Sequence, residues 1–306
     1  MAHLIDNNGV GLRETALATG TGARWDSARR GWYKFSRNSL SSVGLAIVIL
    51  SVLLAAFAPW VTPFPEHAGP VVDILNASHA PNGVNFFGTD LVGRDILSRV
   101  VFAFRTALLM GAMVLGLSVP PGVVMGLVAG YYQGTWLDTV LMRVTDIFLS
   151  VPPLMLALAI ASVLTPNLFN GMVAVTLMWW PWYARLVYGL TSALRNEYFV
   201  SSAEVLGASK AHILFREILP NCLSPILTKM SLDMGWVILI GSSLSFVGLG
   251  EQPPTPGLGT MVADGARNLP DLWWLAVFPA LAIVMLVLGF NLLGDGIRDM
   301  FAADDS

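Results

Sequence analysis

Residues 189–222 read GLTSALRNEYFVSSAEVLGASKAHILFREILPNC, and the interpretation of the whole chain depends on this connection. Short helical patterns lie on both sides of Gly207, and Pro220 closes the segment, which predicts a helix-turn-helix. Glycine at the centre lets the backbone reverse at low steric cost. One face of the predicted unit is apolar and needs a protein groove to bury it; its residues are Val205, Leu206, Ile213, Leu214 and Ile218. The segment therefore implies a partner subunit.

The composition around this segment excludes an ordinary soluble enzyme. The chain has 306 residues, of which 55% are hydrophobic and 12% are charged, and its mean hydropathy is +0.67. An average soluble protein carries about 25% charged residues. This apolar excess is more than a soluble core would hold, so we expect lipid to be the solvent for much of the chain.

Five stretches lack every charged residue and histidine, namely 39–65, 106–137, 147–184, 234–250 and 272–294. About 20 apolar residues cross a bilayer as a helix, so four of these stretches suit one crossing each. The stretch 147–184 has 38 residues and is interrupted by a polar, helix-stopping cluster made of Thr165, Pro166, Asn167, Asn170 and Gly171. It predicts two helices joined by a tight turn. We therefore expect an all-α integral membrane fold with six transmembrane helices.

The basic residues predict the orientation, because cytoplasmic loops of membrane proteins are enriched in Lys and Arg. With the N-terminal tail in the cytoplasm, 13 of the 17 Lys and Arg residues lie on that side, and both termini are cytoplasmic. The predicted organisation is a cytoplasmic tail with an interfacial amphipathic helix (1–41), a first transmembrane helix (42–62), an extracytoplasmic segment (63–105), a transmembrane core that includes the cytoplasmic loop 189–222 (106–297) and a cytoplasmic tail (298–306).

The sequence contains none of the common catalytic motifs. HExxH and Gly-x-Ser-x-Gly do not occur, and none of the three lysines follows a glycine, which excludes a P-loop. The four histidines fall outside the predicted spans, so no base is offered at membrane depth. Aromatic and basic residues interleave in the tail, which favours a helix at the lipid headgroups over nucleic-acid binding. We expect no catalytic residue, metal site or cofactor in this chain, and a partner must supply any energy.

Lys229 and Asp233 are the charged residues at the start of the fifth predicted span. They lie four residues apart on one helical face, so they can pair. One interpretation is a pair that lines a path or responds to protonation. The other is a neutralised structural pair near the interface, with the lysine reaching water. Because Lys229 is predicted to lie within a turn or two of the membrane surface, we favour the structural interpretation.

Two further patterns predict local packing. Gly122, Gly126 and Gly130 recur at every fourth position and predict a smooth helix face on which another backbone can approach closely. Residues 88–99 carry charges of alternating sign. They predict ion pairs along an interfacial helix, between Asp90 and Arg94 and between Asp95 and Arg99.

Residues 203–220 also resemble a known sequence signature. Ala203-x-x-x-Gly207 followed by Ile218-Leu219-Pro220 resembles the EAA loop of permease subunits of bacterial ABC importers. The flanks add to the likeness: GTDxxGRDxxSR at 88–99, WPxxAR at 180–185, LSFVGLG at 244–250 with PPTP at 253–256, and NLLGDGxRD at 291–299. Together they resemble the C-type permease subunit of the dipeptide/oligopeptide/nickel importer family over residues 25–300. Ser201-Ser202 stands where the family has Glu-Ala, so no role is carried over for a glutamate at 201.

The resemblance implies a type I ABC importer permease fold in the bacterial inner membrane and a set of partners. These are a second, homologous permease subunit, two cytoplasmic ATPases that bind ATP and Mg, and an extracytoplasmic substrate-binding protein. It also implies that the loop docks into the ATPase and transmits its movement, and the residues expected to do so are Ala203, Glu204, Gly207, Ala208, Ser209 and Pro220. The implied cargo is a peptide, with nickel chelates, oligosaccharides and opine-like solutes as alternatives.

The connection after the fifth predicted span is expected on the outer side. Its prolines stiffen it, so Glu251, Pro253, Pro254 and Pro256 could present a fixed surface to the binding protein, and a plain structural loop is the alternative. A protein of another class, a stand-alone secondary transporter or channel, would also have many spans. It would not need a partner-seeking loop, and the inverted repeats usual in such proteins are not visible in the sequence.

Overall fold

The computed structural model describes residues 31–301. Residues 31–37 are helical, and Asn38 then caps the first of the longer helices by accepting a hydrogen bond from the amide of Leu40. The α-helices that follow are α3 (Ser39–Ala56), α4 (Ala58–Val61), α5 (Ile96–Tyr131), α6 (Trp136–Leu149), α7 (Pro153–Val163), α8 (Leu168–Leu194), α9 (Tyr198–Val205), α10 (Lys210–His212), α11 (Leu219–Phe246), α12 (Leu258–Ala266) and α13 (Trp274–Phe301). Within residues 31–301 there is no β-strand, only a bridge between Thr89 and Asp95.

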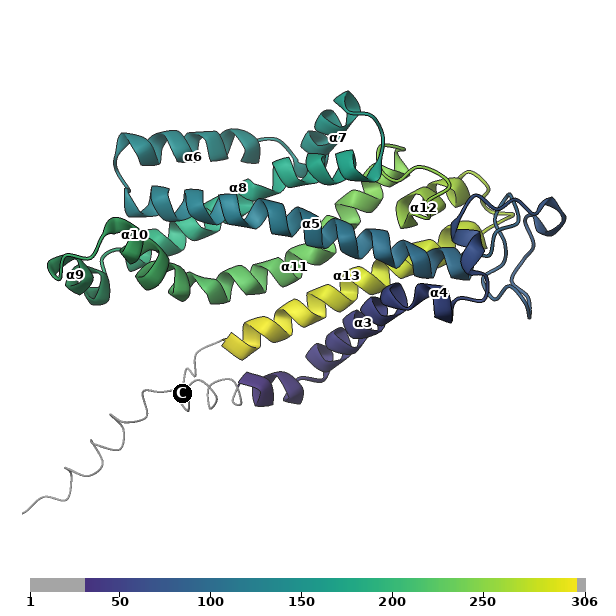
Figure 1. Ribbon diagram of the computed structural model, residues 1–306, viewed down its shortest axis with the longest axis horizontal. Coiled ribbons are helices and arrows are strands. Elements are labelled where there is room, and N and C mark those ends of the chain that lie inside the picture. The colour runs from purple at the N-terminus through teal and green to yellow at the C-terminus, as the bar shows by residue number, and fades with distance from the viewer. Residues whose placement is uncertain (1–30, 302–306) are drawn as a thin grey trace, which may run out of the picture.

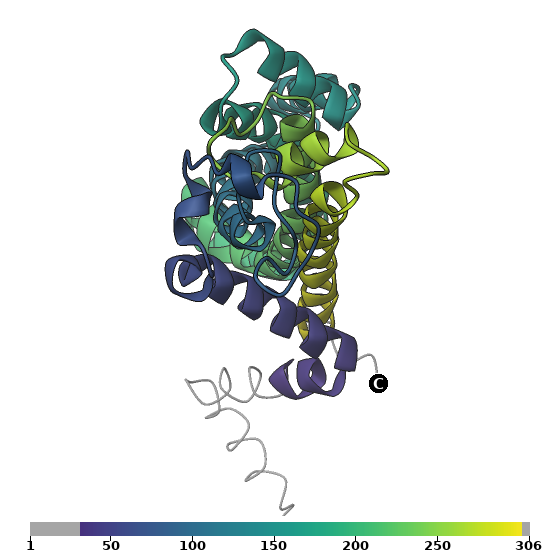
Figure 2. The same ribbon diagram turned by 90° about the vertical axis from the view of Figure 1, so that its right-hand side faces the viewer.

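The long helices form one elongated bundle (Figure 1). The short helices α9 and α10 lie at one end of it, and the irregular segment 62–95 lies at the other. Both views place α3 and the pair α6 and α7 on opposite sides of the bundle (Figure 2). The predicted tail helix is described only from residue 31, and residues 1–30 and 302–306 lie outside the described part of the chain.

Four helical segments of the described chain are long and apolar enough to cross a membrane: Ser39–Ala56, Ile96–Tyr131, Lys210–Phe246 and Trp274–Phe301. A fifth span is formed if α6 and α7 are taken together, although they meet at an angle of 86°. The bend falls at Pro152 and Pro153, where proline removes a backbone donor and restricts the residue before it. The third predicted span is therefore bent rather than straight.

Two predicted boundaries are wrong, because charged residues were taken as helix ends. α5 begins at Ile96, so the last ten residues of the predicted outer segment 63–105 are helical. The fifth span begins well before residue 229, since Lys210–Phe246 is helical throughout. The turn predicted in the stretch 147–184 is confirmed: α7 ends at Val163, and Asn167 caps α8 through the amide of Asn170.

The predicted glycine face is confirmed as the contact between α5 and α8. A Cβ atom added at Gly122 would lie 2.5 Å from the carbonyl oxygen of Trp180, and one at Gly126 would lie 2.6 Å from that of Ala184. At Gly130 the nearest atom, Cβ of Thr191, would be 2.7 Å away. These separations are shorter than any ordinary contact, so the two backbones touch over about two helical turns.

The outer segment differs from the predicted interfacial helix. Residues 88–95 form a turn in which the carboxylate of Asp90 accepts from the amides of Val92 and Arg94 and pairs with Arg94 Nε at 2.7 Å. Asp95 does not pair with Arg99; it caps α5, accepting from Ser98 N at 2.8 Å. Aspartate competes well for amides in turns and at helix N-termini, which explains why the first pair is confirmed and the second is wrong.

We predict that Gly126→Ala destabilises the protein by about 1–3 kcal/mol, because the added methyl group forces α5 and α8 apart. Gly116→Ala is the matched control in the same helix, since a Cβ atom there meets nothing within 4 Å. Thermal unfolding of the purified protein in detergent measures the difference. Equal melting temperatures for the two variants would contradict the close contact.

Candidate functional site

The cytoplasmic loop predicted from the sequence is a helix-turn-helix made of α9, Gly207 and α10. Gly207 has φ +79°, a left-handed conformation that other residues rarely adopt. Its amide donates to the carbonyl of Glu204, and the amide of Ala208 donates to the carbonyl of Ala203, both at 3.0 Å. An added Cβ at Gly207 meets nothing within 4 Å, so glycine is needed there for its backbone conformation alone.

Side chains tie this turn to the end of α5. The hydroxyl of Tyr131, at the last residue of α5, donates to Glu204 Oε1 and accepts from Lys210 Nζ at 2.7 Å. Lys210 also pairs with Glu204 Oε1 at 3.1 Å. The hydrogen bond from Tyr131, and then the one from Lys210, lower the pKa of Glu204. Ser209 caps α10 by accepting from the amide of His212. The loop is therefore fastened to a long helix of the bundle.

The apolar face predicted for this loop is split by the structure. Ile213 and Ile218 are fully buried, and Leu214 is nearly so, because all three pack into the chain's own core with α5 and α8. Val205 and Leu206 are 89% and 86% exposed. The prediction of one face of five residues is therefore wrong. Only the tip of the loop still needs a partner surface, and Tyr198, 90% exposed, extends it.

Pro220 does not end the segment as predicted. A π-helical turn over Ile213–Ile218 leads directly into α11, with Pro220 in the first turn of that helix. Proline has no amide to donate and is tolerated in a first helical turn, so the chain passes through it without stopping. The loop and the following span are one continuous helical segment, Lys210–Phe246.

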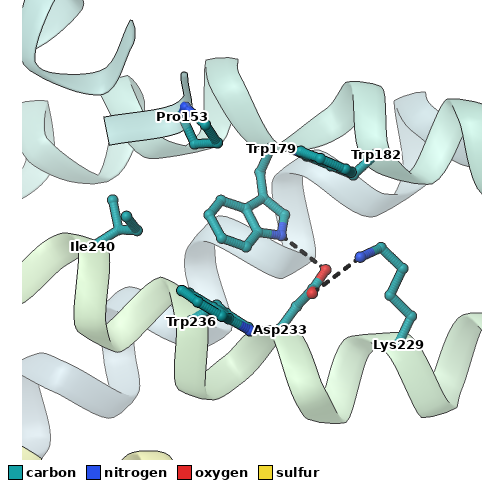
Figure 3. A pocket seen from close by; sticks show the side chains of 7 residues that line it. All are labelled: Pro153, Trp179, Trp182, Lys229, Asp233, Trp236 and Ile240. Carbon is teal, nitrogen blue, oxygen red and sulfur yellow. Dashed lines mark hydrogen bonds and ion pairs between the residues drawn. The ribbon is translucent and has the colours of Figure 1, made fainter. Parts of the chain in front are cut away.

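A second site lies at the middle of the bundle, around the pair Lys229 and Asp233 (Figure 3). Lys229 Nζ lies 3.1 Å from Asp233 Oδ1, so the predicted ion pair is confirmed. The other carboxylate oxygen accepts from Trp179 Nε1 of α8 at 2.9 Å. Asp233 is 14 residues from the start of α11 and 13 from its end, about 20 Å from either. The pair therefore lies along the middle part of α11, and its depth in the membrane stays a prediction.

This pair borders two cavities. The first holds about 400 Å³ and is walled by Pro153 of α7, Trp179 and Trp182 of α8, and Lys229, Asp233, Trp236 and Ile240 of α11. The second, of about 610 Å³, extends toward Arg298 at the end of α13 and shares Lys229, Asp233 and Trp236 with the first. The two cavities therefore adjoin along α11, and the ion pair lines both of them.

The predicted outer surface is only partly exposed. Glu251 is 6% exposed and accepts a hydrogen bond from the hydroxyl of Ser245, so its prediction as a surface contact is wrong. Burial raises the pKa of Glu251. Pro253 and Pro254 are exposed, whereas Pro256 is buried. The surface of this loop is thus limited to residues 252–255.

Comparison with known proteins identifies the family. Residues 122–304 match the family model described as binding-protein-dependent transport system inner membrane component, and residues 27–81 match the N-terminal transmembrane domain of oligopeptide transport permease C. The chain belongs to this family of permeases. The match covers the loop 198–212 and both cavities, so these sites lie within the part that defines the family.

Three relatives align with this permease over most of the length of both chains. A probable D,D-dipeptide transport system permease protein of Escherichia coli K12 is 37% identical over 277 residues, covering 90% of this chain and 91% of the relative. A dipeptide transport system permease protein of Haemophilus influenzae is 36% identical, covering 88% and 92%. A glutathione transport system permease protein of Escherichia coli O6:K15:H31 is 38% identical, covering 88% of each.

A solved structure supports the same fold. An inward-facing structure of the MetNI methionine ABC transporter aligns with a TM-score of 0.56 at 17% identity, covering 68% of this chain and 98% of that one. The permease therefore has the fold of an ABC importer permease and is a multi-pass protein of the inner membrane. Its family consists of transport components rather than enzymes. Within residues 31–301 no cluster of three or more His, Cys, Asp or Glu side chains is placed to hold a metal ion.

Sequence reasoning missed Tyr131 and Trp179, the two side chains that connect the predicted residues to the bundle. Trp179 lies 54 residues from the aspartate it binds, and Tyr131 lies 73 residues from Glu204. The spacing of residues within one segment gives no indication of contacts with residues so far away in the sequence. The cluster WWPW at 179–182, opposite a charged pair, is the one feature of the sequence that could have drawn attention to the cavity.

We predict that Ile213→Ala lowers the stability of the permease by about 2–5 kcal/mol, because it leaves a cavity in a packed core. Leu206→Ala, which deletes an equal number of carbon atoms from an exposed position, is expected to change stability by less than about 0.5 kcal/mol. Thermal unfolding of the purified permease compares them. A larger loss for Leu206→Ala would mean that the loop tip is covered within this chain.

Proposed function

We propose that this permease forms half of the translocation path of an ATP-driven importer of peptides. The observation that carries the proposal is the match along about nine-tenths of the chain to permeases named for dipeptide transport. The glutathione relative supports the same class of cargo, since glutathione is also a short peptide. The two adjoining cavities along α11 give such a cargo a place in the chain.

Six spans with both termini in the cytoplasm are the topology we propose. To the four long apolar helices and the bent pair α6 and α7 it adds α8, whose 27 residues are about 40 Å long. The side chain of Asn38 before α3 donates to Asp299 near the end of α13 at 3.2 Å, so the two ends of the described chain meet. A topology in which both ends of the described chain, α9 and α10 lie in the cytoplasm agrees with the distribution of basic residues.

We further propose that the exposed tip of the loop docks into a cytoplasmic ATPase. Val205 and Leu206 are large, apolar and almost fully exposed, which is costly in water and favourable in a protein groove. In the proposed complex two such ATPases bind ATP and Mg, and a second, homologous permease completes the path. Trp182 and Trp236, 42% and 55% exposed at the open side of the first cavity, lie where that second permease would cover them.

The contacts of the loop suggest how movement would be transmitted. When the ATPases close, Ala203, Glu204, Gly207, Ala208 and Ser209 move with them in the proposed mechanism. Glu204 and Lys210 pass the displacement to Tyr131 at the end of α5, and the helical segment through Pro220 passes it to α11. α11 lines both cavities, and α5 packs against α8, which also lines them, so the path would open to the outer side.

An extracytoplasmic binding protein would deliver the cargo to the opposite end of the bundle. Pro253 and Pro254 are exposed on a loop whose base is anchored by Glu251, and two adjacent prolines restrict the backbone of this loop. Arg99 Nη1 also contacts the carbonyl of Pro254 at 3.4 Å. A loop held in this way suits a fixed docking surface.

We predict that Gly207→Val abolishes ATP hydrolysis coupled to transport while the permease remains in the membrane, because valine resists a φ of +79° and would change the turn that carries the exposed tip. Gly134→Val is the matched control. It places the same residue at φ +84° in the connection between α5 and α6, also with open space around it. Normal coupling in Gly207→Val, or equal loss in both variants, would contradict a specific role for the loop.

The cargo is tested with the whole complex in lipid discs and its binding protein. We expect di- and oligopeptides to stimulate ATP hydrolysis, and nickel chelates, oligosaccharides and opine-like solutes to leave it at the basal rate. Stimulation by one of the other solutes alone would keep the importer and reject the peptide cargo. Failure of any ATPase to associate with the chain would instead favour a stand-alone transporter.

A further inference from the structure

The two charged residues of the first cavity, Lys229 and Asp233, differ in how many of their hydrogen-bonding positions are already used. Both oxygens of Asp233 already have partners, Lys229 on one side and Trp179 on the other, and the residue is 5% exposed. The side chain of Lys229 is 27% exposed and contributes its ammonium group to the walls of both cavities. A protonated lysine has three N–H donors, and Asp233 takes one of them. The cavity therefore offers a cation with unused donors and a buried carboxylate that holds it.

Aromatic rings fix the position of this cation. Lys229 Nζ lies 5.8 Å from the ring centre of Trp182 and 5.4 Å from that of Tyr183. Ring faces attract an ammonium group without using up its hydrogen-bond donors in the way that a carboxylate does. Asp233 and the two rings thus hold Lys229 in place from three directions, and its remaining donors are available to a ligand.

The depth of the pair argues for a ligand as well. Charged groups at the centre of a bilayer are costly, and they are usually retained where they face a cavity and serve a pathway. A pair needed only for packing would be more stable if both residues were apolar. Here Asp233 lies about 20 Å from either end of α11 and Lys229 about 15 Å from its start, and both residues line two cavities.

We propose that the first cavity is a transient subsite for the C-terminal end of a peptide, in which Lys229 binds the terminal carboxylate. Trp182 and Trp236 then contact the last side chain of the peptide. Exposed indole rings offer apolar contact area that tolerates many side chains. A volume of about 400 Å³ lies within the usual range of small-ligand sites, about 300–1,000 Å³. The inference deepens the proposed function and rests on peptides being the cargo.

Asp233 is a positioning residue in this arrangement. It holds Lys229 and neutralises its charge in the absence of cargo, which lowers the cost of keeping an ammonium group at this depth. A carboxylate that arrives at Lys229 adds a second anion beside Asp233. This repulsion limits the affinity of the subsite, and cargo must leave such a site readily if it is to be transported.

The test compares the dipeptide Ala-Phe with its C-terminal amide, which lacks the carboxylate charge. Binding to the whole complex in lipid discs, without the binding protein, is measured by saturation-transfer NMR, which detects weak ligands. We expect the free acid to bind about tenfold more tightly than the amide or better, as a charge-assisted hydrogen bond would provide.

Four forms of the complex separate the roles of the two charges. Lys229→Met alone would leave Asp233 buried without its partner and endanger folding, so the informative variant is the double substitution Lys229→Met with Asp233→Asn. We expect it to bind acid and amide equally. Wild type, Lys229→Arg and Asp233→Asn each keep the cation and are expected to prefer the acid. Co-elution of the ATPases and the second permease with each variant in size-exclusion chromatography shows that each complex is assembled.

The outcomes distinguish the subsite from the function on which it rests. If the wild-type complex binds the acid and the amide equally, or if the double variant keeps the preference for the acid, the subsite is wrong and peptide transport is unaffected. If no peptide binds the wild-type complex and none stimulates ATP hydrolysis in the presence of the binding protein, both the subsite and the proposed cargo are wrong.

Discussion

The close contact between α5 and α8 is the constraint on which the arrangement of both sites depends. Three glycines of α5 let its backbone touch that of α8, with Gly126 facing the carbonyl of Ala184. α5 ends at Tyr131, which binds Glu204 of the loop, and α8 carries Trp179, which binds Asp233 in the cavity. The loop and the cavity are therefore attached to one packed pair of helices, and a shift of one helix against the other would disturb both.

α11 provides a second connection between the two sites. The helical segment Lys210–Phe246 begins inside the loop and passes Lys229 and Asp233 at its middle. The π-helical turn at Ile213–Ile218 is the irregular part of this connection, and such turns are frequent at functional positions in helices. Because Ile213 and Ile218 are buried against α5 and α8, the turn is held in the same core as the glycine contact.

The sequence predicts the features that depend on residues close together in the chain. It does not predict the features that depend on contacts between residues far apart in the chain. Gly207 adopts the left-handed conformation expected of a glycine at a reversal, and the polar cluster at 165–171 separates two helices as expected. Lys229 and Asp233 were expected at the end of a span because charged residues often mark one, whereas each neutralises the other along the middle part of α11. Ile213 was predicted to be exposed to a partner because the sequence does not show that the helix after the turn folds back onto α5 and α8.

The proposed docking of the loop tip around Leu206 in an ATPase subunit is central to how the assembled importer would work. A photoreactive benzoyl-phenylalanine at position 206 of the intact complex tests it directly. The same group at Val163, 86% exposed at the C-terminal end of α7, is the control. The account predicts a crosslink from position 206 to the ATPase and none from position 163. Crosslinks from position 206 only to lipid or to the second permease would contradict it.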